Sequence, residues 1–132
     1  MSLAELNALD AAKALEEGAF SALELTQACL DRIDEIDGDI EAWTHIDRDH
    51  ALAQAGAADE VRQAGLPTGP LFGLPVAVKD IFDTHDMPTE CGTPLYAART
   101  PSSDSTVVAL LRQAGAIIIK LTKTLSIQSF LN

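Results

Sequence analysis

Residues 74–80 read Leu-Pro-Val-Ala-Val-Lys-Asp, a run of five apolar residues that is followed directly by a lysine and an aspartate. A short apolar run rich in β-branched residues is typical of a buried strand. Because side chains alternate across a strand, Lys79 is expected on the face opposite Val76 and Val78.

A second apolar run, Ala-Ile-Ile-Ile at 116–119, predicts another strand. The connection between the two runs begins with an irregular, proline-containing stretch at 80–102. Ser103 or Asp104 is then expected to cap a helix that Gly115 ends. Strand, helix and strand in this order form a βαβ unit, so the two strands should be parallel and the fold class α/β.

The N-terminal half, residues 1–65, is expected to be helical. Ser21 and Glu24 have the spacing of a capping box, and Leu23, Leu30 and Ile33 are expected on one face of the helix that follows it. Expected elements are helices over 3–17, from 21 to 37–39 and over 47–64, with an extended stretch at 40–46.

The bulk composition excludes several function classes. A formal net charge of −11 argues against binding to nucleic acid or to anionic lipid. Cys29 and Cys91 lack metal-site or disulfide spacing, and two free thiols suit a reducing cytoplasm. No basic leader is present, and no apolar run reaches the roughly 18 residues of a membrane span. We therefore expect a cytoplasmic protein without membrane contact.

Two strands are too few for a parallel sheet that is covered on both faces. We therefore expect the 132 residues to be the opening part of a larger, incomplete domain. In this interpretation, residues 1–65 form a helical region, 66–120 form the βαβ unit that carries the lysine, and 121–132 form a divergent tail.

Lys79 has two interpretations on the residues alone. Ligand sites in open α/β sheets gather at the carboxyl ends of strands, and a lysine that loses its hydration there becomes a better base. Alternatively, the side chain extends to solvent or pairs with a carboxylate such as Asp80. The residues themselves leave both interpretations open.

Three further stretches stand in a fixed order: 72–80 (Phe-Gly-Leu-Pro-Val-Ala-Val-Lys-Asp), 88–94 (Pro-Thr-Glu-Cys-Gly-Thr-Pro) and 104–116, which begins Asp-Ser-Thr-Val-Val and ends Leu-Arg-Gln-Ala-Gly-Ala. Together they resemble the amidase signature family, which includes the A subunit of the tRNA-dependent amidotransferase. The Ala-rich opening helices are similar too, so the resemblance covers about residues 5–119. It implies a larger mixed sheet that is flanked by helices.

The resemblance also implies a chemistry. Members of the family hydrolyse or transfer amides with a Ser–cis-Ser–Lys arrangement, and Lys79 matches the lysine. In such enzymes the lysine deprotonates a bridging serine, which activates the nucleophilic serine, and water releases the acyl-enzyme. This implies a small-molecule amide as substrate and no metal or organic cofactor.

The family's two serines lie downstream of this segment, in a loop rich in glycine and serine that also forms the oxyanion hole. None of the serines in this chain has such a context, and Ser103 and Ser105 are expected to be helix-start residues. Where the family continues Gly-Lys-Thr after the second strand, this chain has Lys120 and Leu121. We predict that the isolated chain has no amidase activity; stoichiometric labelling by a serine-directed probe would contradict this.

Other polar residues receive simpler interpretations. Asp83, His85 and Asp86 are expected to form a hydrated loop rather than a metal site. His45 and His50 have the wrong spacing for a metal pair on one helix face. The resemblance places four further residues near Lys79 without assigning their roles: Thr89, Cys91, Gly92 and Thr93.

Three hypotheses remain. The first is the N-terminal part of an amidase that acts on a small molecule, with Lys79 as the base. The second is a fragment of the A subunit of a tRNA-dependent amidotransferase, which would use glutamine and bind the other subunits. The third is a non-catalytic remnant that acts as an interaction module and self-associates through its open sheet.

Overall fold

The computed structural model describes residues 2–43 and 46–121 of the chain. His45, part of the predicted extended stretch, and nearly all of the predicted tail, with Ser126 and Ser129, lie outside the described residues. Within the described part, no helix is long and apolar enough to cross a membrane. The elements, in order, are a 3-10 helix Leu3–Glu5, α1 (Ala8–Glu17), α2 (Ala22–Ile40), α3 (Arg48–Gln63), β1 (Pro75–Lys79), a 3-10 helix Pro94–Tyr96, α4 (Thr106–Gln113) and β2 (Ile117–Leu121).

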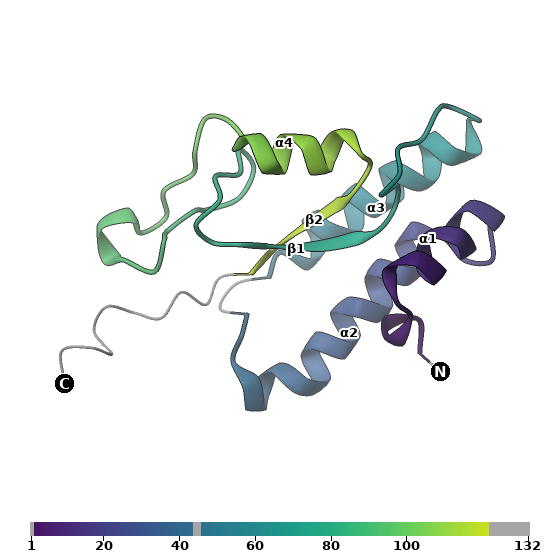
Figure 1. Ribbon diagram of the computed structural model, residues 1–132. Coiled ribbons are helices and arrows are strands. Elements are labelled where there is room, and N and C mark those ends of the chain that lie inside the picture. The colour runs from purple at the N-terminus through teal and green to yellow at the C-terminus, as the bar shows by residue number, and fades with distance from the viewer. Residues whose placement is uncertain (1, 44–45, 122–132) are drawn as a thin grey trace.

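The two strands are parallel, which confirms the predicted βαβ unit and the α/β class. Their register runs from Pro75 opposite Ile117 to Lys79 opposite Leu121. The chain crosses from β1 to β2 through a long connection and then α4 (Figure 1).

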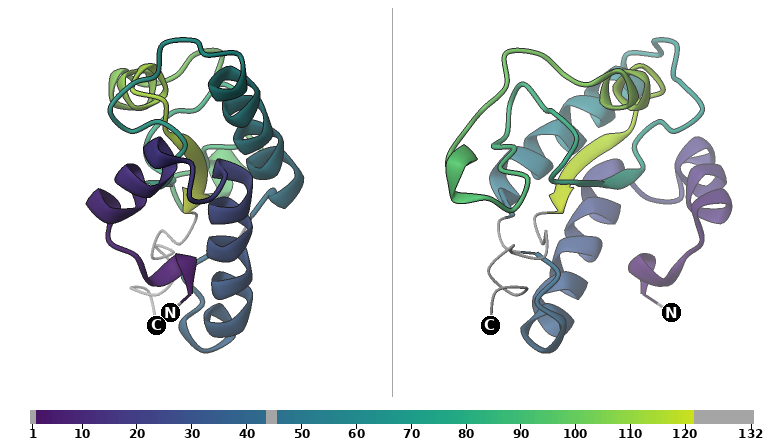
Figure 2. Two further views of the ribbon diagram at one scale, coloured as in Figure 1. Left: turned by 90° about the vertical axis from the view of Figure 1, so that its right-hand side faces the viewer. Right: turned by 60° about the vertical axis from the view of Figure 1, so that its left-hand side comes forward.

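The strands lie between α4 on one side and α2 with α3 on the other (Figures 1 and 2). On the α4 side, Val78 and Ile118 pack in one buried cluster with Val108. On the opposite side, Ile117 and Ile119 belong to two clusters that α2 and α3 complete. Alternation along β2 therefore buries both faces of that strand.

The N-terminal helix is divided, so the prediction of one helix over 3–17 is wrong. Asn7 starts α1 as its N-cap, where its side-chain oxygen accepts a hydrogen bond from the Asp10 N–H at 2.9 Å. Since an N-cap residue has extended backbone dihedrals, it ends the preceding turn. The predicted stop at Gly18 is confirmed, with φ at +71°.

The second helix begins with the predicted capping box of Ser21 and Glu24. It is longer than predicted, because the chain stays helical through Gly38 to Ile40. Leu30 is fully buried, but Leu23, which was expected on the same face, is 43% exposed. In that first turn, Ala22 and Leu25 make the core contacts instead.

The third and fourth helices differ in how they begin. Asp47 caps α3 as predicted, accepting a hydrogen bond from the His50 N–H. For α4, the prediction of Ser103 or Asp104 as the cap is wrong, because Ser105 takes the N-cap position and its hydroxyl makes no capping bond. The Asp104 carboxylate is engaged elsewhere, with His85 and Arg112.

Candidate functional site

Lys79 is the last residue of β1, and its side chain is exposed. Val78 is buried and Ala77 is exposed, so the predicted alternation holds at this end of the strand. Among the described residues, no hydrogen bond or ion pair involves the Lys79 amine. The described part of the chain thus leaves this amine in solvent, and it pairs with no carboxylate there.

Asp80 turns to the opposite face, where it is only 2% exposed. Its carboxylate accepts a hydrogen bond from the Glu90 N–H at 3.1 Å, and its main-chain carbonyl accepts one from the Cys91 N–H at 3.1 Å. Burial raises the pKa of this carboxyl, while the Glu90 N–H and the charge of Lys120 act in the other direction. Asp80 therefore holds the 90–91 backbone against the end of β1.

The backbone after this contact is tightly turned. Cys91 and Gly92 both have left-handed dihedrals, with φ of +51° and +66°. The Thr93 hydroxyl then caps the 3-10 helix Pro94–Tyr96, accepting from the Leu95 N–H. These contacts bring segment 91–93 beside the carboxyl end of β1, but the roles of its side chains stay unassigned.

Lys120 is the buried lysine of this site, and sequence reasoning did not single it out as a functional residue. It is 3% exposed, and its Nζ lies 2.7 Å from the Phe82 carbonyl oxygen and 3.9 Å from an Asp80 oxygen. Nζ also donates to two buried hydroxyls, those of Thr84 at 3.1 Å and Thr89 at 2.8 Å. Burial lowers the pKa of the Lys120 amine, and the Asp80 charge opposes that shift.

One signal in the sequence could have identified Lys120. Period-two alternation along β2 places residue 120 on the same face as Ile118, which is the face that α4 covers. A lysine at a position that the pattern reserves for an apolar side chain indicates a buried charge with partners of its own.

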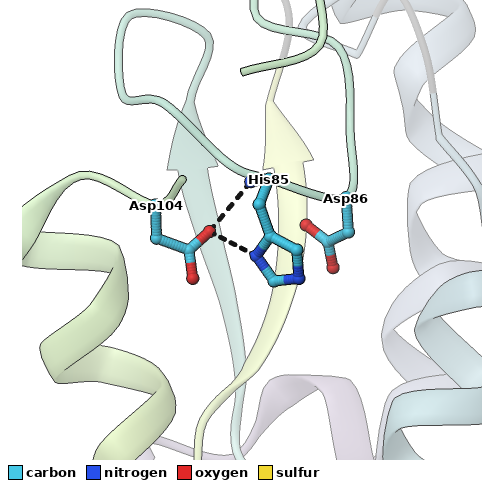
Figure 3. Close-up of side chains that lie close together, drawn as sticks. All are labelled: His85, Asp86 and Asp104. Atoms are coloured by element: carbon cyan, nitrogen blue, oxygen red, sulfur yellow. Dashed lines mark hydrogen bonds and ion pairs between the residues drawn. The ribbon is translucent and has the colours of Figure 1, made fainter. Parts of the chain in front are cut away.

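A second polar cluster ties the connection to α3 and α4. Asp86 accepts from His50 Nε2 at 2.7 Å and from Arg112 Nη2 at 2.6 Å. Asp104 accepts from Arg112 Nε at 3.0 Å and from both the main-chain N–H and Nδ1 of His85 at 2.9 Å. Figure 3 shows the His85 ring between the two carboxylates.

The segment is the loop that the sequence predicted, with His85 exposed, and its charged side chains are in addition paired. Asp83 is also paired, with the Arg99 guanidinium at 2.9 Å. His85, Asp86 and Asp104 lie close enough together to hold a metal ion. However, Arg112 already neutralises both carboxylates, so an incoming cation would have to displace a bonded guanidinium. The arrangement fits an ion-pair network better than a metal centre.

The network makes stability sensitive to acid. Burial raises the pKa values of Asp86 and Asp104, but their hydrogen bonds with His50 and His85 and the Arg112 charge outweigh burial and leave both pKa values lowered. A lowered carboxyl pKa contributes stability that is present above the unfolded value, about 4, and is lost as pH falls through the folded value. The free energy of unfolding should therefore fall steeply below about pH 4.

Arg112→Met tests this contribution. We expect the variant to lose about 2–4 kcal/mol at pH 7, because two largely buried carboxylates lose a shared partner. Its further loss between pH 4 and pH 3, measured by urea unfolding, should be smaller than that of the wild type. Arg32→Met is the control, since its exposed pair with Glu35 is worth under about 1 kcal/mol. An acid slope unchanged in Arg112→Met would contradict the assignment.

A cavity of about 490 Å³ lies elsewhere, between α1 and segment 68–72. Lys13, Glu16 and Arg62 contribute its charged walls. No residue of β1 or of the 80–105 connection lines it, so it gives no support to a site at Lys79.

Known proteins are similar to most of this chain. The model of the family Amidase matches residues 24–130. In Thermobifida fusca, the A subunit of glutamyl-tRNA(Gln) amidotransferase is 46% identical over 117 residues, which cover 89% of this chain and 24% of the relative. The corresponding protein of Salinispora arenicola is 44% identical with equal coverage. The chain spans about a quarter of the length of these curated relatives.

Solved structures show the same fold. A peptide amidase from Stenotrophomonas maltophilia is 32% identical, with a TM-score of 0.79 over 91% of this chain and 24% of its own. Fatty acid amide hydrolase superposes with a TM-score of 0.84 over 92% of this chain and 22% of its own, and at 23% identity it supports the fold alone. These matches and the family model together show that the chain belongs to the amidase family.

Proposed function

We propose that this chain is the lysine-bearing N-terminal part of an enzyme that cleaves the C–N bond of a small-molecule amide. The observation that carries the proposal is Lys79, which stands at the carboxyl end of β1 within the stretch that resembles the family motif. The proposal includes a cytoplasmic location, with Cys29 and Cys91 as free thiols. It also treats residues 1–132 as an incomplete part of a larger domain.

In the proposed mechanism, the Lys79 amine acts as the base that takes a proton from a bridging serine, which activates a second serine. That serine attacks the amide carbonyl, ammonia or an amine leaves, and water hydrolyses the acyl-enzyme. What this chain contributes is a base at a fixed backbone position, because five consecutive residue pairs hold β1 against β2 up to Lys79 itself. The amine is free of competing partners among the described residues.

The serines that this chemistry needs are proposed to come from outside this chain. Ser2 and Ser21 hold the N-caps of helices with their hydroxyls, and Ser105 occupies the N-cap position of α4. Ser102 and Ser103 are exposed in the same connection as Ser105. The Ser2 and Ser21 hydroxyls are committed to backbone N–H groups, which makes them poor nucleophiles.

The proposal is tested on the native gene product and on the isolated 132 residues in parallel. The native product should release ammonia from a panel of primary amides and react stoichiometrically with a fluorophosphonate probe. The isolated chain should do neither. Its labelling would show that a nucleophile lies within these residues, and an inert native product would refute the amidase proposal.

A second candidate is the glutamine-dependent reaction. The two relatives named for glutamyl-tRNA(Gln) amidotransferase favour it, at 46% and 44% identity. We propose glutamine as the first substrate to compare with acetamide and benzamide. A kcat/KM for glutamine at least about 100-fold above both would favour the amidotransferase, and association with its other subunits would be tested next.

The third hypothesis, a non-catalytic interaction module, makes a different prediction. The described sheet has two strands, so one edge of each lacks a neighbour in the described part of the chain. Unpaired strand edges favour association. Sedimentation of the isolated chain should show self-association if these edges stay open, and a monodisperse monomer that unfolds cooperatively would argue against the module.

A further inference from the structure

The Lys120 amine is fully hydrogen-bonded by the residues around it. An ammonium group has three donors, and here all three are used, on the Phe82 carbonyl and on the Thr84 and Thr89 hydroxyls. We call these three acceptors, together with the Asp80 carboxylate at 3.9 Å, the Lys120 cage. Asp80, Thr84 and Thr89 are each at most 2% exposed.

The two threonine hydroxyls donate their own protons to main-chain carbonyls, not to Lys120. Thr84 Oγ1 donates to the Met87 carbonyl at 3.0 Å, and Thr89 Oγ1 donates to the Phe82 carbonyl at 3.5 Å. Each hydroxyl therefore offers only lone pairs to Lys120. A neutral amine has only two N–H donors, so its lone pair would face one of the three acceptors. The cage therefore matches the charged ammonium.

All four members of the cage come from the short segment that follows Lys79 in the chain. Lys120 reaches them from β2, the strand that pairs with β1. We infer that Lys120 is a positioning residue: its ammonium is the cation around which residues 80–89 fold, and it fixes how the chain leaves Lys79.

The cage also acts beyond its own members. Asp80, held by Lys120 on one side, receives the Glu90 N–H on the other, and its carbonyl receives the Cys91 N–H. The left-handed turn at Cys91 and Gly92 follows directly. Loss of the Lys120 charge should therefore loosen the segment beside Lys79 before it affects the helices.

The relevance of this cage to catalysis rests on the proposed function, whereas the cage itself can be tested without any turnover. Lys120→Met keeps most of the side-chain volume and removes the three donors. We expect the Glu90 and Cys91 amides to exchange with deuterium at least about 10-fold faster in this variant, with α2 amides unchanged. Lys13→Met is the matched control, because the Lys13 side chain is 74% exposed and pairs with the exposed Glu17.

Chemical rescue separates a cation site from a general packing role. In Lys120→Ala, methylammonium should restore slow exchange at Glu90 and Cys91 in a saturable manner, and tetramethylammonium at equal ionic strength should not. Exchange that is insensitive to Lys120→Met, or a rescue that both cations supply equally, would overturn the inference. Should Lys120 variants fail to fold, the nearly isosteric Thr89→Val removes one acceptor and should accelerate the same two amides.

A parallel measurement keeps the two proposals distinct. In the native gene product, Lys120→Met should lower kcat for an amide more than it raises KM, and methylammonium should restore kcat in Lys120→Ala. Faster exchange together with an inert wild-type product would refute the proposed function and leave the cage standing. An active wild type with unchanged exchange in Lys120→Met would refute the cage alone.

Discussion

Lys79→Met, introduced into the native gene product, is expected to lower amide turnover by about 10²–10⁴-fold, the usual contribution of a general base. The loss should appear in kcat rather than in KM, because the amine acts on a proton that moves only in the reaction. In the isolated 132 residues the Lys79 side chain is exposed at the end of β1, so removal of its charge there should change the free energy of unfolding by under about 0.5 kcal/mol.

A large loss of turnover with little change in the free energy of unfolding would assign Lys79 to catalysis and not to folding. Lys13→Met, at another exposed lysine, should change neither quantity measurably. Turnover would be measured on the native gene product, and urea unfolding on the isolated 132 residues. A Lys79→Met enzyme that kept more than about a tenth of its kcat would remove Lys79 from the mechanism, whatever the family resemblance implies.

Gly115→Ala is expected to destabilise the chain by about 2–6 kcal/mol, from backbone strain and overpacking together. Gly115 has φ at +92°, and an added Cβ would lie 2.7 Å from the Phe72 Cα. The neighbouring backbone cannot retreat easily, because the Gly73 N–H donates to the Gly115 carbonyl and the Leu71 N–H to the Ala114 carbonyl, both at 2.9 Å. Urea unfolding monitored by circular dichroism measures the change.

Gly56→Ala is the matched control for that variant. Gly56 lies inside α3, and nothing comes within 4 Å of an added Cβ there. Alanine in a helix interior should stabilise the protein by about 0.5–1 kcal/mol. If the free energy of unfolding falls in Gly115→Ala and rises in Gly56→Ala, the destabilisation at Gly115 comes from its backbone conformation and the close 71–73 backbone, and not from the loss of a glycine as such.

The elements that the sequence predicted correctly are those with local signals. Ser21 with Glu24, and Asp47 before an alanine-rich run, can each be recognised within one helical turn. The parallel pairing followed from the order of strand, helix and strand. The break at Asn7 was also locally encoded, since Asn is a preferred N-cap, but the Ala- and Leu-rich composition on both sides of it concealed the boundary.

Interactions between distant residues could not be predicted in this way. Asp59 on α3 accepts from the Ala22 and Leu23 N–H groups, and so caps a helix that lies 36 residues or more away in the sequence. Lys120 meets its hydroxyl partners across 31 and 36 residues. Alternation along β2 can mark Lys120 as a buried lysine, but no periodicity identifies its partners, because Thr84 and Thr89 each resemble an ordinary loop residue. Only the packing of α3 and α4 around the sheet brings them together.

The candidate site, too, was predicted only where the signal is local. The position of Lys79 at a strand end followed from alternation and from the family motif, and the structure places it there. Its desolvation, which the mechanism needs, is not supplied by the described residues, because the β1 face with Ala77 and Lys79 is exposed. The mechanism therefore requires that another part of the native product cover this face and desolvate Lys79.

Arg112 forms ion pairs with both Asp86 and Asp104, so it links an early and a late residue of the connection between β1 and α4 and closes this connection into a loop. Figure 1 shows the 3-10 helix Pro94–Tyr96 at the far tip of this connection. Leu95 at that tip is 89% exposed. Lengthening a closed loop costs only about 0.6 kcal/mol per doubling. In the isolated chain, a reporter inserted at this tip should therefore cost little stability and leave the pairing of β1 with β2 intact.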